Sequence, residues 1–122
     1  MNQEVRLFLI ELARKKKTIT YQELSDACNL KLVMRESEYA RAEIGRILGD
    51  ISTFEFNNKR PLISSLVISK GDSYQGDGFY KLAEALGFGS WKKLKNDISF
   101  EVGQMNACFD FWRDELNYNR WK

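Results

Sequence analysis

The sequence predicts an α+β fold that is mostly helical, with a small two- or three-stranded antiparallel sheet and a long C-terminal helix. Apolar residues recur at helical spacing towards both ends of the chain. Two stretches, residues 18–20 and 62–69, have the β-branched or apolar composition of strands. A chain of 122 residues suits a single domain, 1–122, that buries a core without covalent staples.

The first helix is predicted over residues 2–15 and is closed by three consecutive lysines. Its apolar face is made by Val5, Phe8, Leu9, Leu12 and Ala13. After the short strand at 18–20, Thr20 and Glu23 have the spacing of a capping box, in which each side chain bonds to the other residue's backbone amide. This pattern predicts a second helix over 21–28, ended by Asn29.

A third helix is predicted over residues 38–52, after a linker at 30–37. Its apolar stripe is formed by Ala40, Ile44, Ile47, Leu48 and Ile51. Asn57 and Asn58 predict a bend, and Pro61 precedes the strand at 62–69, where a missing amide costs little.

A glycine-rich loop follows the predicted strand and leads into two further helical regions. Asp77 is expected to cap a fourth helix, which Gly87 ends. The stretch GSWKKLKND predicts another short helix or turn. A last helix is predicted over about 99–121, with two apolar stripes. The first, expected to be core, is Val102, Met105, Phe109, Trp112 and Leu116; the second is Phe111, Tyr118 and Trp121.

Composition narrows the functional classes. The chain has no histidine, which removes the commonest general base and metal ligand. Cys28 and Cys108 are too few for a disulfide framework or a zinc site, so we expect reduced core thiols. The N-terminal residues lack a secretory cleavage pattern, and we expect a cytoplasmic protein that is not an enzyme and has no cofactor or bound metal.

The predicted order of elements resembles a winged helix, with residues 1–80 as the winged-helix-like core and 81–122 as helices packed on it. In that fold the second and third helices form a helix-turn-helix, and a hairpin follows as the wing. The third helix carries Arg41 and Arg46 on its polar face, together with Glu43 and Asp50.

Three stretches, TITYQELSDACNL, ARAEIGRIL and RPLISSLVISKGDSYQGDGF, resemble the DNA-binding domain of the alkylguanine DNA-alkyltransferases. That family has a Thr-Tyr-x-x-(Leu/Ile)-Ala helix start and an Ala-Arg-x-x-Gly-x-x-Leu recognition helix. The matching positions in this sequence are Thr20, Tyr21, Leu24, Ala40, Arg41, Gly45 and Leu48. The resemblance covers roughly residues 5–80 and implies a DNA-binding scaffold in which Arg41 intrudes between bases.

The same resemblance fails at the reactive strand. The family requires Pro-Cys-His-Arg, whereas Pro61 is followed by Leu62, Ile63 and Ser64. An alkyl acceptor must be a thiolate activated by a base. The sequence supplies neither, and we therefore exclude alkyl transfer.

A further resemblance leads to the function that the sequence favours first. Arg-Pro-Leu-x-Ser-x-Leu-Val, then Gly-x-Gly-Phe-x-x-Leu-Ala and a late Phe-Trp are similar to small bacterial proteins, some of which accompany toxins as immunity or antitoxin partners. We expect a non-catalytic protein that neutralises a basic protein toxin, such as a nuclease, by blocking its active site. The predicted contacts are Tyr74, Gln75, Asp77, Phe111, Asp114, Glu115, Tyr118 and Trp121.

The alternative is DNA binding through the third helix and the glycine loop, as in a transcriptional regulator or an alkyltransferase-like DNA binder. The residues predicted for it are Lys15, Lys16, Lys17, Arg41, Arg46, Lys59, Arg60 and Lys70. A net charge of only +2 and the acidic residues in the loop and third helix argue against strong electrostatic attraction to DNA.

Overall fold

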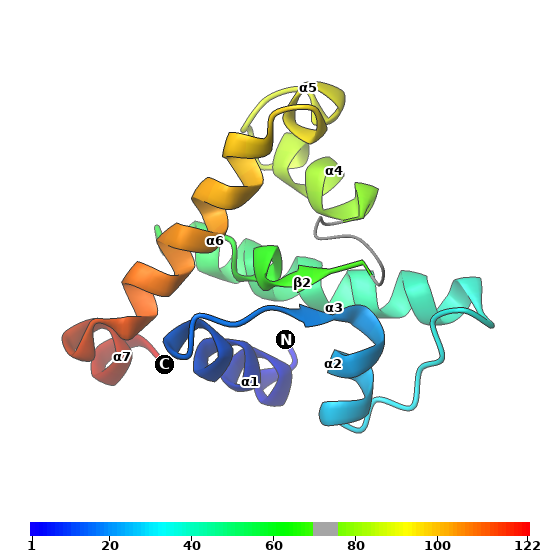
Figure 1. The fold of residues 1–122 in the computed structure, drawn as a ribbon, viewed down its shortest axis with the longest axis horizontal. Helices are drawn as coiled ribbons and strands as arrows, with labels where there is room; N and C mark the ends of the chain where they lie inside the picture. The colour runs from blue at the N-terminus through cyan, green and yellow to red at the C-terminus, as the bar shows by residue number, and fades with distance from the viewer. Residues whose placement is uncertain (70–75) are drawn as a thin grey trace.

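The computed structural model of this chain describes residues 1–69 and 76–122. The described part is mostly helical with one small two-stranded sheet (Figure 1), as the α+β expectation required. The elements are α1 Gln3–Arg14, β1 Ile19–Thr20, α2 Tyr21–Ala27, α3 Glu38–Asn57, the 3₁₀ helix η1 Ile63–Leu66, β2 Val67–Ile68, α4 Asp77–Ala85, α5 Trp91–Lys95, α6 Ile98–Arg113 and α7 Glu115–Trp121.

The main core surrounds η1 and β2. Figure 1 shows α3 running behind this segment, α1 below it and α6 crossing on the left. Residues 62–67 are all buried, Ser64 and Ser65 among them, and Ile68 is half-buried. The segment's neighbours in the core include Leu9 and Ile10 of α1, Ile51 of α3 and Trp112 of α6. In a smaller hydrophobic cluster, α4 packs against Leu62 through its buried residues Phe79, Tyr80 and Ala83.

The sheet is parallel, and the expectation of an antiparallel sheet was wrong. Ile19 pairs with Val67 and Thr20 with Ile68. The predicted strand at 62–69 is mostly the 3₁₀ helix, and only two of its residues pair. Parallel strands need a crossover rather than a tight turn, and here α2 and α3 supply it. The described residues therefore contain no β-hairpin of the kind that forms a wing.

The capping predictions for the early helices are confirmed. Thr20 and Glu23 form the capping box at α2, and Asn29 adopts a φ of 53° just after that helix. At α4 the N-cap is Gly76, so Asp77 is the first helical residue and not the cap that was predicted. Gly87 ends the α4 region at a φ of +97°.

The C-terminal segment is two helices, and the prediction of one long helix was wrong. Asp114 ends α6 and caps α7, accepting a hydrogen bond from the Asn117 amide at 3.0 Å. The first stripe was predicted to be core, but Val102 is 41% exposed and Leu116 80% exposed. No helix among residues 1–69 and 76–122 combines the length and apolar character needed to cross a bilayer.

Candidate functional site

A cavity of about 320 Å³ opens between α2, the start of α3 and the start of α4. Tyr21, the first residue of α2, projects into this region because the capping box fixes where that helix begins. The described lining residues are Tyr21, Met34, Arg41, Ile44, Gly45, Ser69, Gly76 and Gly78. The Gly76 amide donates to the Tyr21 hydroxyl at 3.4 Å, which links α2 to the start of α4.

A second cavity, of about 510 Å³, adjoins the first. The two share Tyr21, Met34, Arg41 and Ser69 among their lining residues, so they form one groove. The second part adds Gln22, Asp26, Val33 and Arg35. We call the combined feature the Tyr21 groove. Its walls are largely apolar and aromatic, with a guanidinium at its junction.

The linker that walls this groove is tied to α2 by polar side chains. Gln22 donates to the Leu32 carbonyl at 3.0 Å and accepts from the Met34 amide at 2.9 Å. Ser25, which is buried, bonds both the amide and the carbonyl of Leu32 at 3.0 Å. These bonds satisfy backbone groups in a segment that lacks regular structure, and they hold Met34 against Arg41.

Arg41 and Arg46 lie one turn or so apart on α3 but differ in their electrostatic surroundings. Arg41 is exposed and donates to the Met34 carbonyl, and no ion pair links it to a carboxylate among the described residues. Arg46 is paired with Glu43 and with Asp50, the latter at 3.0 Å. The hydrogen bond from Arg46 holds the pKa of Glu43 below its usual value. Arg41 is therefore the cation of this helix that remains available to an anion.

Small residues lie along the surface of α3, and Gly45 among them lines the groove. A Cβ built on Gly45 or on Gly49 would meet no described atom within 4 Å. Internal packing therefore does not require glycine at either position. With the exposed Ala42 beside them, these residues leave the helix surface low enough for another backbone to approach closely.

The residues predicted to contact DNA do not share one surface. Lys15, Lys16 and Lys17 are exposed at the end of α1, whereas Arg41 lies near the start of α3. Lys59 follows the far end of α3, whose last residue lies about 24 Å along the helix axis from Arg41. Lys70 lies outside the described residues.

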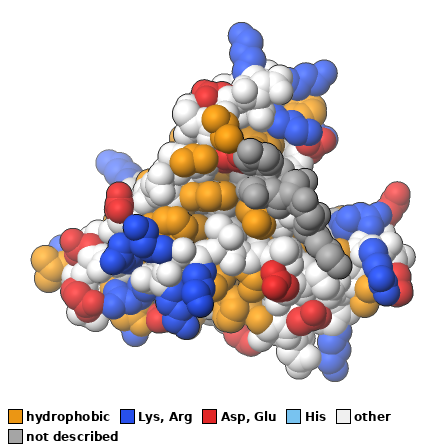
Figure 2. Space-filling model, in the orientation of Figure 1, with side chains coloured by type: hydrophobic (Ala, Val, Ile, Leu, Met, Phe, Trp, Pro, Cys, Tyr) orange, Lys and Arg blue, Asp and Glu red, His pale blue; other side chains and the backbone are white. Residues whose placement is uncertain are grey.

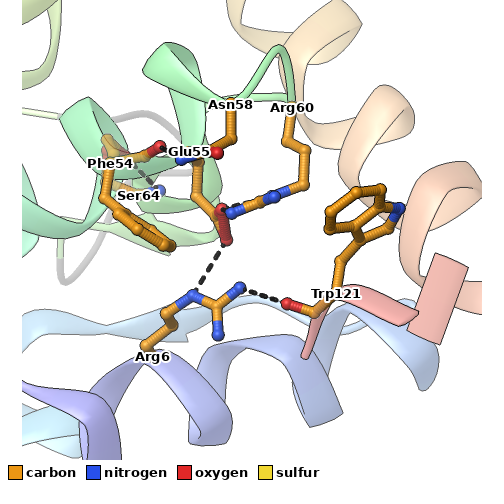
Figure 3. A network of polar contacts seen from close by, with 8 residues as sticks. Arg6, Phe54, Glu55, Asn58, Arg60, Ser64 and Trp121 are labelled. Carbon is orange, nitrogen blue, oxygen red and sulfur yellow. Dashed lines mark hydrogen bonds and ion pairs between the residues drawn. The ribbon is translucent and has the colours of Figure 1, made fainter. Parts of the chain in front are cut away.

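Arg60 was also predicted to contact DNA, but its side chain is only 5% exposed. It pairs with the fully buried Glu55 at 2.5 Å, and the same carboxylate receives Arg6 (Figure 3). A guanidinium held in this way has no free surface for a phosphate, so its assignment to a DNA-contacting surface was wrong.

The residues predicted to bind a toxin are spread over separate regions, and two of them, Tyr74 and Gln75, lie outside the described residues. Asp77 lies at the start of α4, well away from α7 in Figure 1. It pairs with Lys95 at 2.5 Å, and this hydrogen bond lowers the pKa of Asp77.

The other predicted toxin contacts, on α6 and α7, are mostly engaged within the molecule. Glu115 accepts from Arg14 at 2.6 Å and Tyr118 donates to Glu11 at 2.6 Å. Phe111 stacks edge-on against Trp112 with ring centres 4.9 Å apart, and Asp114 is the cap of α7. Trp121 keeps 42% of its surface exposed.

The strand region that resembles the alkyltransferase active strand offers no activated thiol. Leu62 and Ile63 are buried, and the Ser64 hydroxyl is bonded to that of Ser52 at 2.6 Å. The nearest thiol, Cys108, contacts Ser65 and the Leu62 carbonyl. Burial raises its pKa to about 12, so it keeps its proton at neutral pH. Cys28 is also a buried free thiol, and its pKa is raised by burial.

Comparison with known proteins gives no relative for this chain: no family model, no curated protein and no solved structure matches it.

Proposed function

We propose that the chain is a DNA-binding protein in which α2 and α3 act as a helix-turn-helix-like unit and the Tyr21 groove receives part of the nucleic acid. The observation that carries this proposal is that Tyr21, Arg41 and Gly45 line one cavity. These are three of the seven positions at which the sequence resembles the DNA-binding domain of the alkyltransferases, and their common cavity supports the proposal.

The exposed face of α3 has properties that suit a nucleic-acid groove. Its first turns present Tyr39, which is 71% exposed, then Arg41, Ala42 and Gly45. The small residues permit close approach, and the uncompensated guanidinium supplies the positive charge. In helix-turn-helix proteins the N-terminal turns of the second helix contact the bases.

The acidic residues near this surface set the expected strength of binding. Asp26 lines the groove, and Glu43 and Asp50 neutralise Arg46. We therefore expect the protein to neutralise few phosphates. Each phosphate neutralised makes the slope of log K against log salt more negative by about 0.9. We expect a shallow slope, corresponding to about two or three phosphates, with much of the affinity coming from close apolar and stacking contacts in the groove.

Two arginines of α3 provide a matched test. We would titrate a fluorescein-labelled duplex with Arg41→Ala and Arg46→Ala proteins and follow fluorescence anisotropy at low salt. Loss of Arg41 should weaken binding about tenfold, whereas loss of the already paired Arg46 should change it less than about twofold. Equal effects of the two substitutions, or no saturable binding by the unmodified protein, would refute the proposal.

A second candidate is the toxin-neutralising role. The observation that favours it is the exposed apolar surface of α7, where Leu116 is 80% exposed and Trp121 42% exposed, beside Asp114 and Glu115. An aromatic side chain that becomes buried on binding, with acidic residues around it, is suited to a basic partner. The test is to measure hydrogen exchange of the α7 amides with and without a purified basic nuclease toxin. The toxin should increase their protection. Unchanged exchange, together with no inhibition of the nuclease activity, would reject this role.

A further inference from the structure

A row of apolar side chains lies exposed along α6. Ile98 is 55% exposed and Val102 41% exposed, and Met105 and Phe109 follow at half-buried positions. Their spacing of four, three and four residues places them on one side of the helix. Figure 2 shows this row of hydrophobic side chains running along α6. We call these four residues the α6 stripe.

The α6 stripe borders the face with which α6 enters the core, and Met105 and Phe109 pack partly against that core. Cys108 and Trp112 are completely buried and Glu101 is 2% exposed, and these residues project from the neighbouring side of the helix. The stripe is therefore exposed at Ile98 and Val102 and half-buried at Met105 and Phe109, where it meets the core. The row spans about three helical turns, and helix-in-groove recognition uses apolar anchors at i, i+3, i+4 and i+7, which occupy about two turns.

Lysines and an arginine bracket this stripe at both ends. Lys92 and Lys93 of α5 lie just before its first residue, and Arg113 lies one turn after its last. Lys15, Lys16 and Lys17 are also at that second end, because Arg14 beside them donates to the Trp112 carbonyl at 2.9 Å. Figure 2 shows basic side chains gathered at both ends of the row.

The nearby carboxylates cancel only part of this charge. Asp77 is paired with Lys95 and Glu115 with Arg14. Asp97 accepts from the amide and hydroxyl of Ser99, which are neutral donors, so it keeps its negative charge beside the stripe. Asp110 follows Phe109 directly and so projects about 100° around the helix from it. Among the described residues, no ion pair to a carboxylate involves Lys15, Lys16, Lys17, Lys92, Lys93 or Arg113.

We propose that the α6 stripe is the docking site for an acidic amphipathic helix of a partner protein. Apolar anchors at i, i+3 or i+4, and i+7 of the partner would lie on Val102, Met105 and Phe109, and acidic side chains near its two ends would meet the basic clusters. The occupant is protein, because the floor is hydrocarbon and presents no cation to a phosphate along its length. This surface is separate from the Tyr21 groove, and the inference does not depend on DNA binding.

The probe is a fluorescein-labelled peptide of about 18 residues, long enough to span the stripe and both basic ends. It has leucines at helical spacing, glutamates at its ends and alanines elsewhere, and a scrambled peptide of the same composition is the first control. We expect saturable anisotropy with the designed peptide, weakened by salt. Equal binding of the scrambled peptide, or absence of binding, would overturn the proposal.

Two exposed substitutions separate the α6 stripe from the groove. Val102→Glu should weaken peptide binding about tenfold and leave duplex binding unchanged, whereas Ala42→Glu on α3 should do the reverse. Far-UV circular dichroism and urea unfolding check that both proteins remain folded. A peptide affinity unaffected by Val102→Glu overturns the proposal. Loss of duplex binding in the Val102→Glu protein also overturns it, since the occupant of the α6 stripe would then be DNA. If the unmodified protein sediments as a dimer that Val102→Glu dissociates, the occupant would be a second copy of this chain, which overturns the proposal too.

Discussion

The Nε atom of Arg6 lies 3.1 Å from Oε1 of Glu55, across 49 residues of sequence, and both side chains are buried. The other oxygen of this carboxylate accepts from Arg60 Nε at 2.6 Å. Arg6 also donates to the Trp121 carbonyl at 2.8 Å (Figure 3). One carboxylate therefore joins α1, the last turns of α3 and the turn after it, and Arg6 extends the connection to the C-terminal helix.

Substitution of Glu55 tests this network. Glu55→Gln leaves two buried guanidinium groups without a counter-charge, and we expect the free energy of unfolding to fall by about 3–5 kcal/mol in urea denaturation. The control is Glu43→Gln, which removes a half-buried partner of the exposed Arg46 and should cost less than about 1 kcal/mol. Equal losses in the two variants would contradict a structural role for the buried carboxylate.

The capping box decides where α2 begins and therefore how Tyr21 is placed. Thr20→Ala removes the acceptor for the Glu23 amide, which lies at 3.2 Å from the hydroxyl. We expect a loss of about 1 kcal/mol in the free energy of unfolding. Thr18→Ala, at an exposed position before the box, should have little effect. The account of α2 would be wrong if both substitutions were neutral.

The buried thiol of Cys108 predicts a loss of stability at alkaline pH. Its pKa is about 12 in the folded protein and 9.0 as the reference value for an unfolded chain. Above pH 9 the unfolded state loses this proton first, so the free energy of unfolding falls by about 1.4 kcal/mol per pH unit, and below pH 9 there is no effect. Comparison with Cys108→Ala isolates this term. Parallel pH profiles for the two proteins above pH 9 would show that the thiol does not contribute.

The junction between α6 and α7 depends on the Asp114 cap, and α7 has no buried residue. Asp114→Ala should therefore fray α7 while costing about 1 kcal/mol or less of global stability. Hydrogen exchange would show faster exchange of the α7 amides, with those of α3 and η1 unchanged. A large fall in the global free energy of unfolding would mean that α7 is part of the cooperative core.

Local rules predicted the parts of the fold that short-range physics determines. The capping box at Thr20, the left-handed Asn29 and the stop at Gly87 are each confirmed, because each depends on residues within one turn. The apolar face of α1 is also largely confirmed, with Val5, Leu9 and Ala13 fully buried. The third helix extends to Asn57, five residues beyond the predicted end.

Long-range relations were not predictable in the same way. A two-residue parallel pairing between β1 and β2 leaves no periodic signal in the sequence. The apolar run at 62–69 was interpreted as a strand, although a fully buried 3₁₀ helix has the same composition. Asp114 lies within an otherwise helical pattern, and its preference for a cap breaks the helix there.

The candidate site was predictable only as separate motifs. The resemblance selected Tyr21, Arg41 and Gly45, but the cavity that unites them also needs Met34, which the bonds of Gln22 and Ser25 hold in place. The Arg6–Glu55–Arg60 network was missed entirely. One signal was present: Arg6 sits beside the apolar face of α1 and Glu55 lies among aromatic residues, which is unusual for charges at the surface.

The measurement that tests DNA binding most directly is an NMR titration of the ¹⁵N-labelled protein with a duplex. The proposed function predicts that the backbone amides of Tyr21, Arg41 and Gly45 shift together and saturate at one protein per site, while α6 and α7 amides stay in place. Shifts confined to α6 or α7, or no shifts at duplex concentrations that saturate anisotropy, would contradict it.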